Sequence, residues 1–375
     1  MLGETMRVAI DARKLTDYGI GTYLSHLLRG LAERDDVQLA LLVRAGHEER
    51  ALSLAPAARI VSVKAGGYSL SEQVSVPVAL WRERPQLVHF PHYVVPPLVA
   101  HPVVATVHDV IQLFYPPRRH RALALVYMRT MMRSTLRRAR RVITVSRASR
   151  RDLVRLFSAD PSRLVVVANG ADEAFGVRPS SDEIERLKQV YGLRPPLVLA
   201  VANDKPHKNL EMVLRAFHLA RRERRVPGQL VVVGGPDGEH RLARQAQRLG
   251  LGDAMRCLGR VPFADLVGLY HVSSVLLHVA LYEGFGLPVL EAMRAGLPVI
   301  TSNLGAMREV GEGVARLVNP LDVAEVAAAI EQVLVDDPLR RRMIESGRRR
   351  AESLTWERAV EGTIAAYHQA LEVRA

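Results

Sequence analysis

Short apolar runs alternate with longer segments of helical apolar period along nearly the whole chain, and this pattern constrains the fold more than any other feature. Continuous apolar runs are typical of strands buried in parallel sheets, and the helical segments between them are typical of the crossover helices of βαβ units. At 375 residues the chain is also too long for one ordinary hydrophobic core. We therefore expect an α/β protein with two domains, each built around a parallel sheet.

The pattern divides into two series of elements. The first predicts a helix at 19–33 and strands at 7–11, 38–43, 87–90, 103–107, 141–145 and 164–167. The second predicts helices at 209–225, 240–249 and 287–295, and strands at 197–201, 230–233, 255–258, 275–279 and 299–301. Between them, residues 171–179 contain Gly176 and Pro179 and have no periodic apolar face. The expected domains are therefore 1–175 and 176–355, followed by a helix in 356–375.

The charge of the chain is unevenly distributed. Lys and Arg number 52 against 39 Asp and Glu, for a formal net charge of +13. Residues 1–175 hold 25 of the basic and 15 of the acidic residues, so most of the surplus lies in the first half. Such a surplus favours an anionic partner, and nucleic acid, a membrane surface and a sugar nucleotide all qualify.

The cysteine content and the hydropathy limit the kinds of site and the cellular location that we expect. A single cysteine, Cys257, excludes an intramolecular disulfide framework and a multi-cysteine metal site. The first residues lack a signal-peptide apolar run, and no stretch approaches the ~18 uninterrupted apolar residues of a membrane span. We expect a cytoplasmic location in which any membrane contact is peripheral.

The most informative segment, YEGFGLPVLEAM at 282–293, joins an expected strand to an expected helix. Ligands of open α/β sheets bind beyond the carboxyl ends of strands, and glycines there let a ligand approach the backbone. The amides at the start of the helix, with the helix dipole behind them, suit a phosphate or a developing negative charge. The candidate binding residues of this turn are Gly284, Phe285, Gly286 and Leu287.

Two glutamates flank this turn. Glu283 precedes it and Glu291 lies about one helical turn beyond it, so both carboxylates can reach one cleft and accept hydrogen bonds from sugar hydroxyls. The same spacing also fits an ordinary βα turn with a solvated glutamate and a glutamate favoured by the helix dipole. Spacing alone leaves both interpretations open.

The segment EGFGLPVLEAMRAGLPVI at 283–300 resembles the signature of the large family of retaining glycosyltransferases usually numbered four. Further segments support the resemblance in the expected order: GIGTY at 19–23, TVHD at 106–109, TVSRASRRDL at 144–153, NGAD at 169–172, KPHKNL at 205–210, VVVGG at 231–235 and LGRVP at 258–262. The resemblance implies the GT-B fold, in which two Rossmann-like domains face each other across a cleft. It also implies that the helix in 356–375 crosses back to the first domain.

The resemblance assigns roles in the second domain. The family's first glutamate contacts the donor sugar near its anomeric centre and its second binds the ribose, roles that fall on Glu283 and Glu291. Lys208 matches the family's diphosphate-binding lysine, and its ammonium suits the charge that builds on a departing nucleoside diphosphate. Many relatives add an arginine upstream, where this chain has Asn203. Either Lys205 substitutes for that arginine or the leaving group is held by one cation fewer.

In the first domain the resemblance points to a glycine loop and a histidine. Gly19 and Gly21 alone fit an ordinary turn, but family members use this loop beside the donor phosphate and the acceptor, and the GxGxxG spacing of dinucleotide-binding oxidoreductases is absent. His108 follows an expected strand, and the family's matching histidine hydrogen-bonds the transferred sugar. The catalytic candidates are His108, Lys208 and Glu283.

The segment between Arg118 and Arg141 contains nine arginines and no acidic residue. A basic amphipathic helix fits an anionic membrane face, where each cation contributes about 1 kcal/mol. Its apolar stripe also fits packing on the domain core beneath a solvated basic face. Nucleic acid is disfavoured, because Tyr127 is the only aromatic residue of this segment that could stack on a base.

The sequence therefore predicts a retaining glycosyltransferase that moves a hexose from a nucleotide sugar, GDP-mannose or a UDP-hexose, to a saccharide or lipid-linked acceptor in envelope or exopolysaccharide synthesis. No Asp-x-Asp is placed as a diphosphate metal site, so we expect neither a metal nor another cofactor. The alternatives are another GT-B enzyme, such as a nucleotide-sugar epimerase or a phosphorylase, and a nonenzymatic basic protein that binds a membrane or nucleic acid. The expected location is cytoplasmic, peripheral on the inner face of the cell membrane where the basic segment meets lipid.

Overall fold

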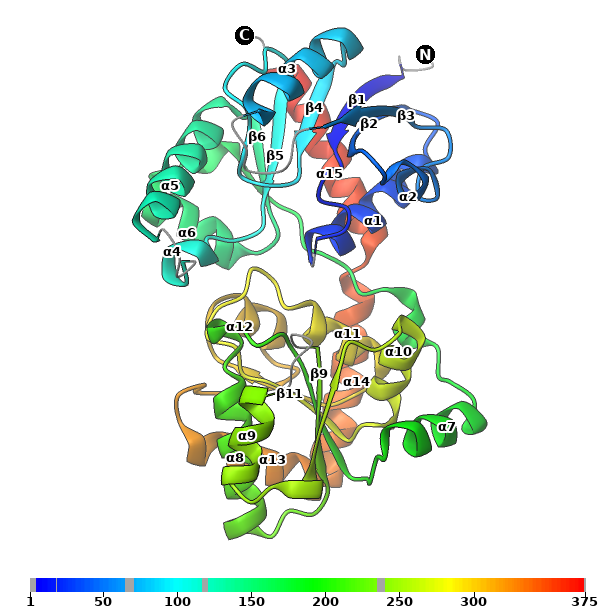
Figure 1. Ribbon diagram of the computed structural model, residues 1–375, viewed down its shortest axis with the longest axis vertical. Coiled ribbons are helices and arrows are strands. Elements are labelled where there is room, and N and C mark those ends of the chain that lie inside the picture. Colours follow the sequence, from blue (N-terminus) through cyan, green and yellow to red (C-terminus); the bar gives the residue numbers. More distant parts are fainter. Residues whose placement is uncertain (1–4, 18, 65–70, 117–120, 235–239, 374–375) are drawn as a thin grey trace. The chain divides into compact units, whose positions relative to one another are not determined.

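The computed structural model describes residues 5–17, 19–64, 71–116, 121–234 and 240–373. The chain divides into two compact units (Figure 1). Unit 1 comprises Met1–Asn169 and Trp356–Ala375, and unit 2 comprises Gly170–Thr355. Among the described residues, unit 1 holds a parallel sheet of seven strands and unit 2 one of six. The predicted α/β class with two parallel sheets is confirmed.

The sheet of unit 1 has the strand order β3-β2-β1-β4-β5-β6-β7. Its strands are β1 (Met6–Asp11), β2 (Val37–Arg44), β3 (Arg59–Val63), β4 (Leu87–Phe90), β5 (Val103–Val107), β6 (Arg141–Thr144) and β7 (Leu164–Val166). The order reverses beside β1, where Val8 lies between Leu39 of β2 and Leu87 of β4. A crevice opens beyond the carboxyl ends of two strands at such a reversal, so the fold presents a ligand site where β1 and β4 end.

The last helix of the chain belongs to unit 1. The helices of this unit are α1 (Ile20–Ala32), α2 (Glu48–Leu52), α3 (Glu72–Glu83), α4 (Ile111–Phe114), α5 (Arg121–Arg138), α6 (Arg147–Phe157), η1 (Pro161–Arg163) and α15 (Trp356–Glu372). Helix α15, red in Figure 1, packs against α1, β5 and β6. His89 in β4 links it to the sheet, because its ring nitrogens hydrogen-bond Tyr367 Oη at 2.7 Å and Thr106 Oγ1 at 2.8 Å.

Unit 2 repeats the same architecture with the strand order β10-β9-β8-β11-β12-β13. Its strands are β8 (Leu197–Val201), β9 (Gln229–Val233), β10 (Met255–Gly259), β11 (Val275–His278), β12 (Val299–Ser302) and β13 (Arg316–Val318). Its helices are η2 (Glu173–Gly176), α7 (Ser181–Tyr191), η3 (Pro206–Lys208), α8 (Leu210–Arg224), α9 (His240–Arg248), η4 (Gly252–Ala254), α10 (Phe263–Val272), α11 (Leu287–Ala295), α12 (Gly305–Gly311), α13 (Val323–Val335) and α14 (Asp337–Ser353). The order reverses between β8 and β11, so the segments that follow these two strands meet at one edge.

The first division of the chain comes earlier than the expected boundary at 175. The first segment of unit 1 ends at Asn169, and η2 packs against α10 and α11 of unit 2. The buried ring of Phe175 lies edge-on to Tyr270, with 5.1 Å between their centroids. This aromatic contact supplies unit 2 with apolar burial that the loop-like sequence does not indicate.

Two predicted features fall partly outside the described residues. Helix α5 is described from Arg121, so Arg118 at the start of the basic segment lies outside them, as does Gly235 of the VVVGG motif. None of the helices in the described part of the chain is both long and apolar enough to cross a membrane.

Candidate active site

Lys208 and Glu283 meet where β8 and β11 end. Lys208 is the last residue of η3, and Glu283 lies in the loop between β11 and α11. Lys208 Nζ donates a hydrogen bond to Glu283 Oε1 and forms an ion pair with it. The backbone holds the two loops together, since the Leu281 amide donates to the carbonyl of His207 at 2.7 Å. Two candidates predicted from separate motifs therefore form one charged site.

Asn209 fixes the loop that carries Lys208. A polar residue just before a helix commonly caps it, but the Asn209 side chain makes no cap hydrogen bond to α8. Its amide instead donates to the carbonyls of Val279 at 3.0 Å and Pro320 at 2.9 Å. Its backbone has a φ of 58°, a left-handed conformation that asparagine tolerates better than most residues. The residue that follows Lys208 is therefore tied to the end of β11 and to the segment after β13.

His278 is a third member of this site, and none of the motifs indicates it. It is the last residue of β11, is 3% exposed, and its Nε2 lies 3.0 Å from Glu283 Oε1. Because the carboxylate can only accept, the Nε2–H group donates this hydrogen bond. The one sequence signal was a polar residue at the end of the apolar strand VLLH, five positions before Glu283.

The two glutamates of the motif have opposite electrostatic environments. Burial by itself would raise the pKa of Glu283, but the Lys208 ammonium and the His278 hydrogen bond lower that pKa to about 2. Burial raises the pKa of Glu291 to about 7, despite a hydrogen bond of 2.7 Å from the hydroxyl of Tyr270. At neutral pH, Glu283 is therefore a fixed anion, whereas Glu291 exchanges between its neutral and ionised forms.

The turn between the glutamates has a backbone conformation at Gly286 that disfavours any side chain there. This residue has a φ of 101°, and a Cβ there would lie 2.1 Å from the Met307 Cε atom. Pro288 occupies the first turn of α11, where its missing N–H costs no hydrogen bond. Gly284 and Phe285 are buried and Leu287 is half-buried beside them. The four predicted residues thus form one compact turn at the N-terminus of α11.

Asn203 and Lys205 lie between β8 and η3. Lys205 is exposed and directly precedes η3, so its ammonium is close in sequence to Lys208 without being buried with it. The side-chain Oδ1 of Asn203 is buried and has no hydrogen-bond partner among the described residues. A buried acceptor without a partner is uncommon in proteins, and it points to a polar ligand or water at this position.

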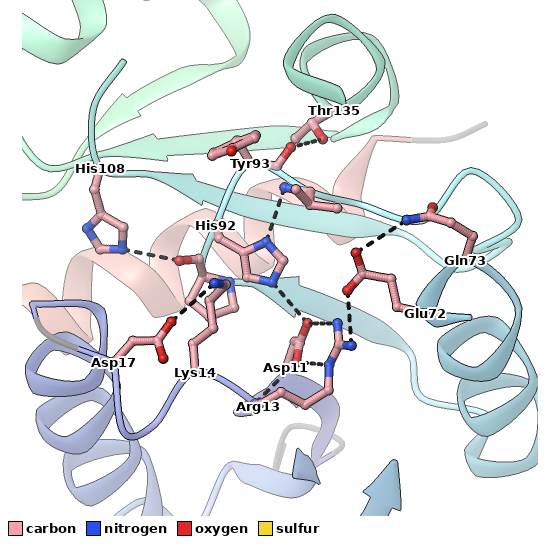
Figure 2. Close-up of polar contacts among 12 residues, drawn as sticks. Asp11, Arg13, Lys14, Asp17, Glu72, Gln73, His92, Tyr93, His108 and Thr135 are labelled. Carbon is pink, nitrogen blue, oxygen red and sulfur yellow. Dashed lines mark hydrogen bonds and ion pairs between the residues drawn. The ribbon is translucent and has the colours of Figure 1, made fainter. Parts of the chain in front are cut away.

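In unit 1 the predicted residues lie at the carboxyl edge of the sheet. Gly19 precedes α1 with a φ of 68°, and a Cβ on Gly21 would lie 2.5 Å from the Leu15 carbonyl oxygen. His108 follows β5, and its Nε2–H donates to the carbonyl of Pro91 at 3.2 Å (Figure 2). Burial lowers the pKa of His108 to about 4. The ring is therefore neutral at pH 7, and its Nδ1 is an acceptor.

The structure thus groups the candidates of each unit separately. Lys208, Glu283, Glu291 and the turn gather in unit 2, whereas the glycine loop and His108 gather in unit 1. Within the described residues, no three His, Cys, Asp or Glu side chains are grouped closely enough to hold a metal ion. The polar groups of unit 2 can bind a phosphorylated ligand through one ammonium, backbone amides and two carboxylates.

Comparison with known proteins matches both units in order. The Glycosyltransferase Family 4 profile matches residues 18–175, and the Glycosyl transferases group 1 profile matches residues 182–350. The O-antigen chain mannosyltransferase B of Escherichia coli is 31% identical over 280 residues, which are 74% of this chain and 73% of that protein. The MMP alpha-(1->4)-mannosyltransferase of Mycolicibacterium hassiacum is 32% identical over 289 residues, 72% of this chain and 66% of that protein.

The solved structures agree with this match at the level of the fold. Sucrose-phosphate synthase from Thermosynechococcus elongatus superimposes with a TM-score of 0.80 over 97% of this chain and 98% of that chain, at 21% identity. In each parallel sheet, family motifs follow strands beside the point where the strand order reverses. GIGTY follows β1 in unit 1, and KPHKNL and EGFGLP follow β8 and β11 in unit 2. Since family profiles cover both units and a relative above 30% identity spans most of the chain, the chain belongs to glycosyltransferase family 4, the glycosyl transferases group 1, and has the GT-B fold.

Proposed function

We propose that this glycosyltransferase transfers a hexose from a nucleotide sugar to a saccharide or lipid-linked acceptor, with retention of anomeric configuration, in envelope or exopolysaccharide synthesis. The observation that carries the proposal is the Lys208–Glu283 ion pair, supported by His278, beside the turn that begins α11. An ammonium next to helix N-terminal amides provides what a departing diphosphate requires.

The mechanism follows from the charges of unit 2. The diphosphate of the donor lies against Lys208 and the amides of residues 285–287, where the dipole of α11 adds to the attraction. As the bond from the anomeric carbon to phosphate breaks, these groups stabilise the negative charge on the leaving oxygen. Glu283, ionised, accepts hydrogen bonds from hydroxyls of the sugar, and Glu291 pairs with a ribose hydroxyl.

The acceptor oxygen attacks the anomeric carbon from the face that the diphosphate leaves. Its proton passes to an oxygen of the leaving phosphate, so the new bond has the configuration of the old one. His108 of unit 1 contributes as a neutral ring whose Nδ1 accepts a hydrogen bond from a sugar hydroxyl, because its Nε2–H is held by the Pro91 carbonyl. In this proposal unit 2 binds the donor and unit 1 binds the acceptor.

The leading donor is GDP-mannose, with a UDP-hexose as the alternative. Both curated relatives reported above are mannosyltransferases by name, which favours a mannose donor for this chain as well. Thermal-shift screening of nucleotide sugars, followed by an assay of donor hydrolysis and NMR assignment of the product anomer, tests the proposal. Donor epimerised without acceptor, or cleaved only with phosphate, would indicate the epimerase or phosphorylase activity instead. An inverted anomer would contradict retention.

We also propose that the outer face of α5 contacts an anionic membrane. The inner face of this helix packs through Met128 and Met132, which are 2% and 0% exposed. The core therefore accounts for that stripe but not for Leu123 and Val126, which are 70% and 63% exposed among arginines. Toward the C-terminal end of α5, a cavity of about 510 Å³ is lined by residues of α5 and α6 and the segment that follows, among them three arginines, Arg133, Arg137 and Arg163, and one acidic residue, Asp160.

This arrangement suits the negatively charged inner face of a membrane. Co-sedimentation with vesicles of phosphatidylglycerol and phosphatidylcholine tests it. Binding should fall when Leu123 and Val126 are both changed to Ser, and it should fall with added salt. Equal binding of the double variant and the unchanged protein would remove the membrane proposal and leave the transfer reaction untouched.

A further inference from the structure

Unit 1 contains a small polar cavity where β1 and β4 end, lined by residues that lie outside the family motifs considered above. Figure 2 shows the polar contacts among most of these residues. Its volume is about 160 Å³, below the ~300–1,000 Å³ of sites that enclose drug-sized ligands. Among the described residues, its polar lining consists of Arg13, Lys14, Asp17, Arg44, Glu72 and His92. These side chains come from the ends of β1, β2 and β4 and from the start of α3, so the reversal of strand order gathers them.

Beneath the cavity lies a buried ionic network centred on Arg13. Its guanidinium donates to both oxygens of Asp11, at 2.8 and 2.7 Å, and to Glu72 Oε2 at 3.1 Å. The three residues are at most 4% exposed. Within the described residues these carboxylates use three of the five N–H groups of Arg13, so two stay available to an occupant. The network holds the floor of the cavity in one geometry.

The net stability that such a network adds to a fold is small compared with apolar packing. Buried ion pairs contribute little net stability, because apolar side chains of similar volume commonly replace them without loss. The β1 strand already supplies apolar burial through Val8, Ala9 and Ile10, which are 0% exposed. A buried arginine with spare donors, opening onto a cavity, is therefore better explained by a ligand than by packing.

The charged groups of the cavity are of both signs. Its described lining carries the cations Arg13, Lys14 and Arg44 and the carboxyl groups of Asp17 and Glu72, and the Asp11 carboxylate lies beneath it on Arg13. Burial would raise the pKa of Asp11, but Arg13 and His92 hold that pKa well below its usual range, so this carboxylate is ionised. Lys14 Nζ also lies 3.2 Å from Asp17 Oδ2. With Asp11 included, the cationic and carboxyl groups of the described residues are equal in number, which favours an uncharged polar ligand over a strongly charged one.

One wall of the cavity is less polar. His92 accepts a hydrogen bond from the Val94 amide at Nδ1, 3.1 Å, and donates from Nε2 to Asp11 Oδ2 at 3.0 Å. Both nitrogens are therefore occupied, so His92 has only ring C–H groups left to offer a ligand, and Val94 also lines the cavity. A lining with donors, acceptors and an apolar wall fits a sugar ring, which has hydroxyls at its edge and C–H groups on its face. A phosphate has no such apolar face.

We infer that this cavity binds one uncharged, hydroxyl-bearing ring of the acceptor saccharide. The inference rests on the proposed transfer reaction. The cavity adjoins both unit 1 candidates, because the Asp17 carbonyl accepts from the Gly21 amide at 2.7 Å, and Pro91, the neighbour of His92, accepts from His108. A ring held here is oriented by the same loop and the same histidine that the reaction uses.

Saturation-transfer NMR of the full chain with methyl α-D-mannopyranoside, glucopyranoside and galactopyranoside tests the inference. At least one hexoside should bind the unchanged protein, and Arg44→Ala and Asp17→Asn should each weaken it about tenfold, the usual effect of losing a hydrogen bond to a charged group. Both residues are solvent-exposed at the rim, so these variants should fold normally. Arg59→Ala, at an exposed arginine of β3 outside the cavity, is the matched control and should bind normally.

The outcomes separate the cavity from the transfer reaction. No binding of any hexoside, equal binding by all variants, or displacement of the hexoside by equimolar inorganic phosphate would overturn the inference. Donor hydrolysis by the unchanged protein tests the proposed function independently. Hexoside binding that depends on Arg44, together with no hydrolysis of any nucleotide sugar, would reject the proposed function. The inference that the cavity binds a hexose ring would still stand.

Discussion

The two units use buried charge in different ways. In unit 2, the Lys208 and Glu283 side chains are 16% and 13% exposed; Lys208 ends the short helix η3 and Glu283 lies on a loop. In unit 1, the Arg13 and Asp11 side chains are 3% and 0% exposed and lie at the end of a central strand. An accessible pair can exchange its partner for a diphosphate, whereas a fully enclosed pair cannot separate without leaving a charge unpaired. The first pair is suited to a reaction, and the second is suited to holding a shape.

The largest expected effect is on stability, and it should come from unit 1. Arg13→Met leaves the ionised Asp11 buried without its main partner, so the free energy of unfolding should fall by about 3–5 kcal/mol. Lys208→Met, at the accessible pair, should change it far less. Urea unfolding followed by circular dichroism measures both. Equal losses of unfolding free energy in the two variants would contradict the difference between the buried and the accessible ion pair.

The next effect is on catalysis and should come from unit 2. Lys208→Ala and Glu283→Ala should each lower the rate of transfer by ~10²-fold or more, the scale for removing one charge-stabilising contact. The matched control is Lys188→Ala, because Lys188 lies on the surface of α7 and pairs with Glu185 at 3.2 Å. Near-normal turnover of either site variant, with folding intact, would show that this ion pair is not the centre of the reaction.

Glu291 should show the opposite pH response from Glu283. Its pKa is raised to about 7 in the fold from an ordinary 4.5, so the folded state holds a proton that the unfolded state loses. Stability from this residue is therefore fully present below about pH 4.5 and is lost as the pH rises through 7, by about 3 kcal/mol. Glu291→Gln should flatten that part of the pH–stability curve. A variant curve parallel to the unchanged protein's would exclude Glu291 as its source.

His278 should have a smaller effect, through Glu283. His278→Phe removes the hydrogen bond to Glu283 and should lower kcat about tenfold, whereas His278→Gln, which can still donate, should keep more of the activity. Losing that hydrogen bond also raises the pKa of Glu283, so the acid limb of the pH–rate profile should move to higher pH in the Phe variant. An unmoved acid limb would mean that His278 only fills space.

The sequence predicted the central parts of this fold better than its edges. The strand expected at 103–107 coincides with β5, which is buried throughout, so its apolar run is continuous. Strand β3 (RIVSV) was not predicted, because it lies at the edge of the sheet and most of its residues are partly exposed. Strand β13 has three residues at the other sheet's edge and offers too short a pattern.

The residues of the candidate site could also be predicted only in part from the sequence. Motifs located Lys208 and Glu283, but their pairing depends on β8 and β11 being neighbours, which the order of elements along the chain does not state. The ionic partners Arg13 and Glu72 are 59 positions apart, and each separately resembles an ordinary surface residue. Long-range pairing is set by sheet topology, so residues whose chemistry depends on it are hidden from local patterns.

The smallest expected effect concerns whether unit 2 needs a divalent cation to stabilise the leaving diphosphate. If Lys208 and the first amides of α11 carry the leaving diphosphate, no divalent cation is needed for that task, and transfer in excess EDTA should equal transfer in magnesium. The initial rate of transfer, measured after exhaustive dialysis against chelator and again after adding magnesium or manganese, decides this. A rate that collapses in chelator and returns with one metal would show that the ammonium and amides are insufficient. The charge balance of the donor site would then have to include a cation held jointly by the nucleotide and Glu283 or Glu291.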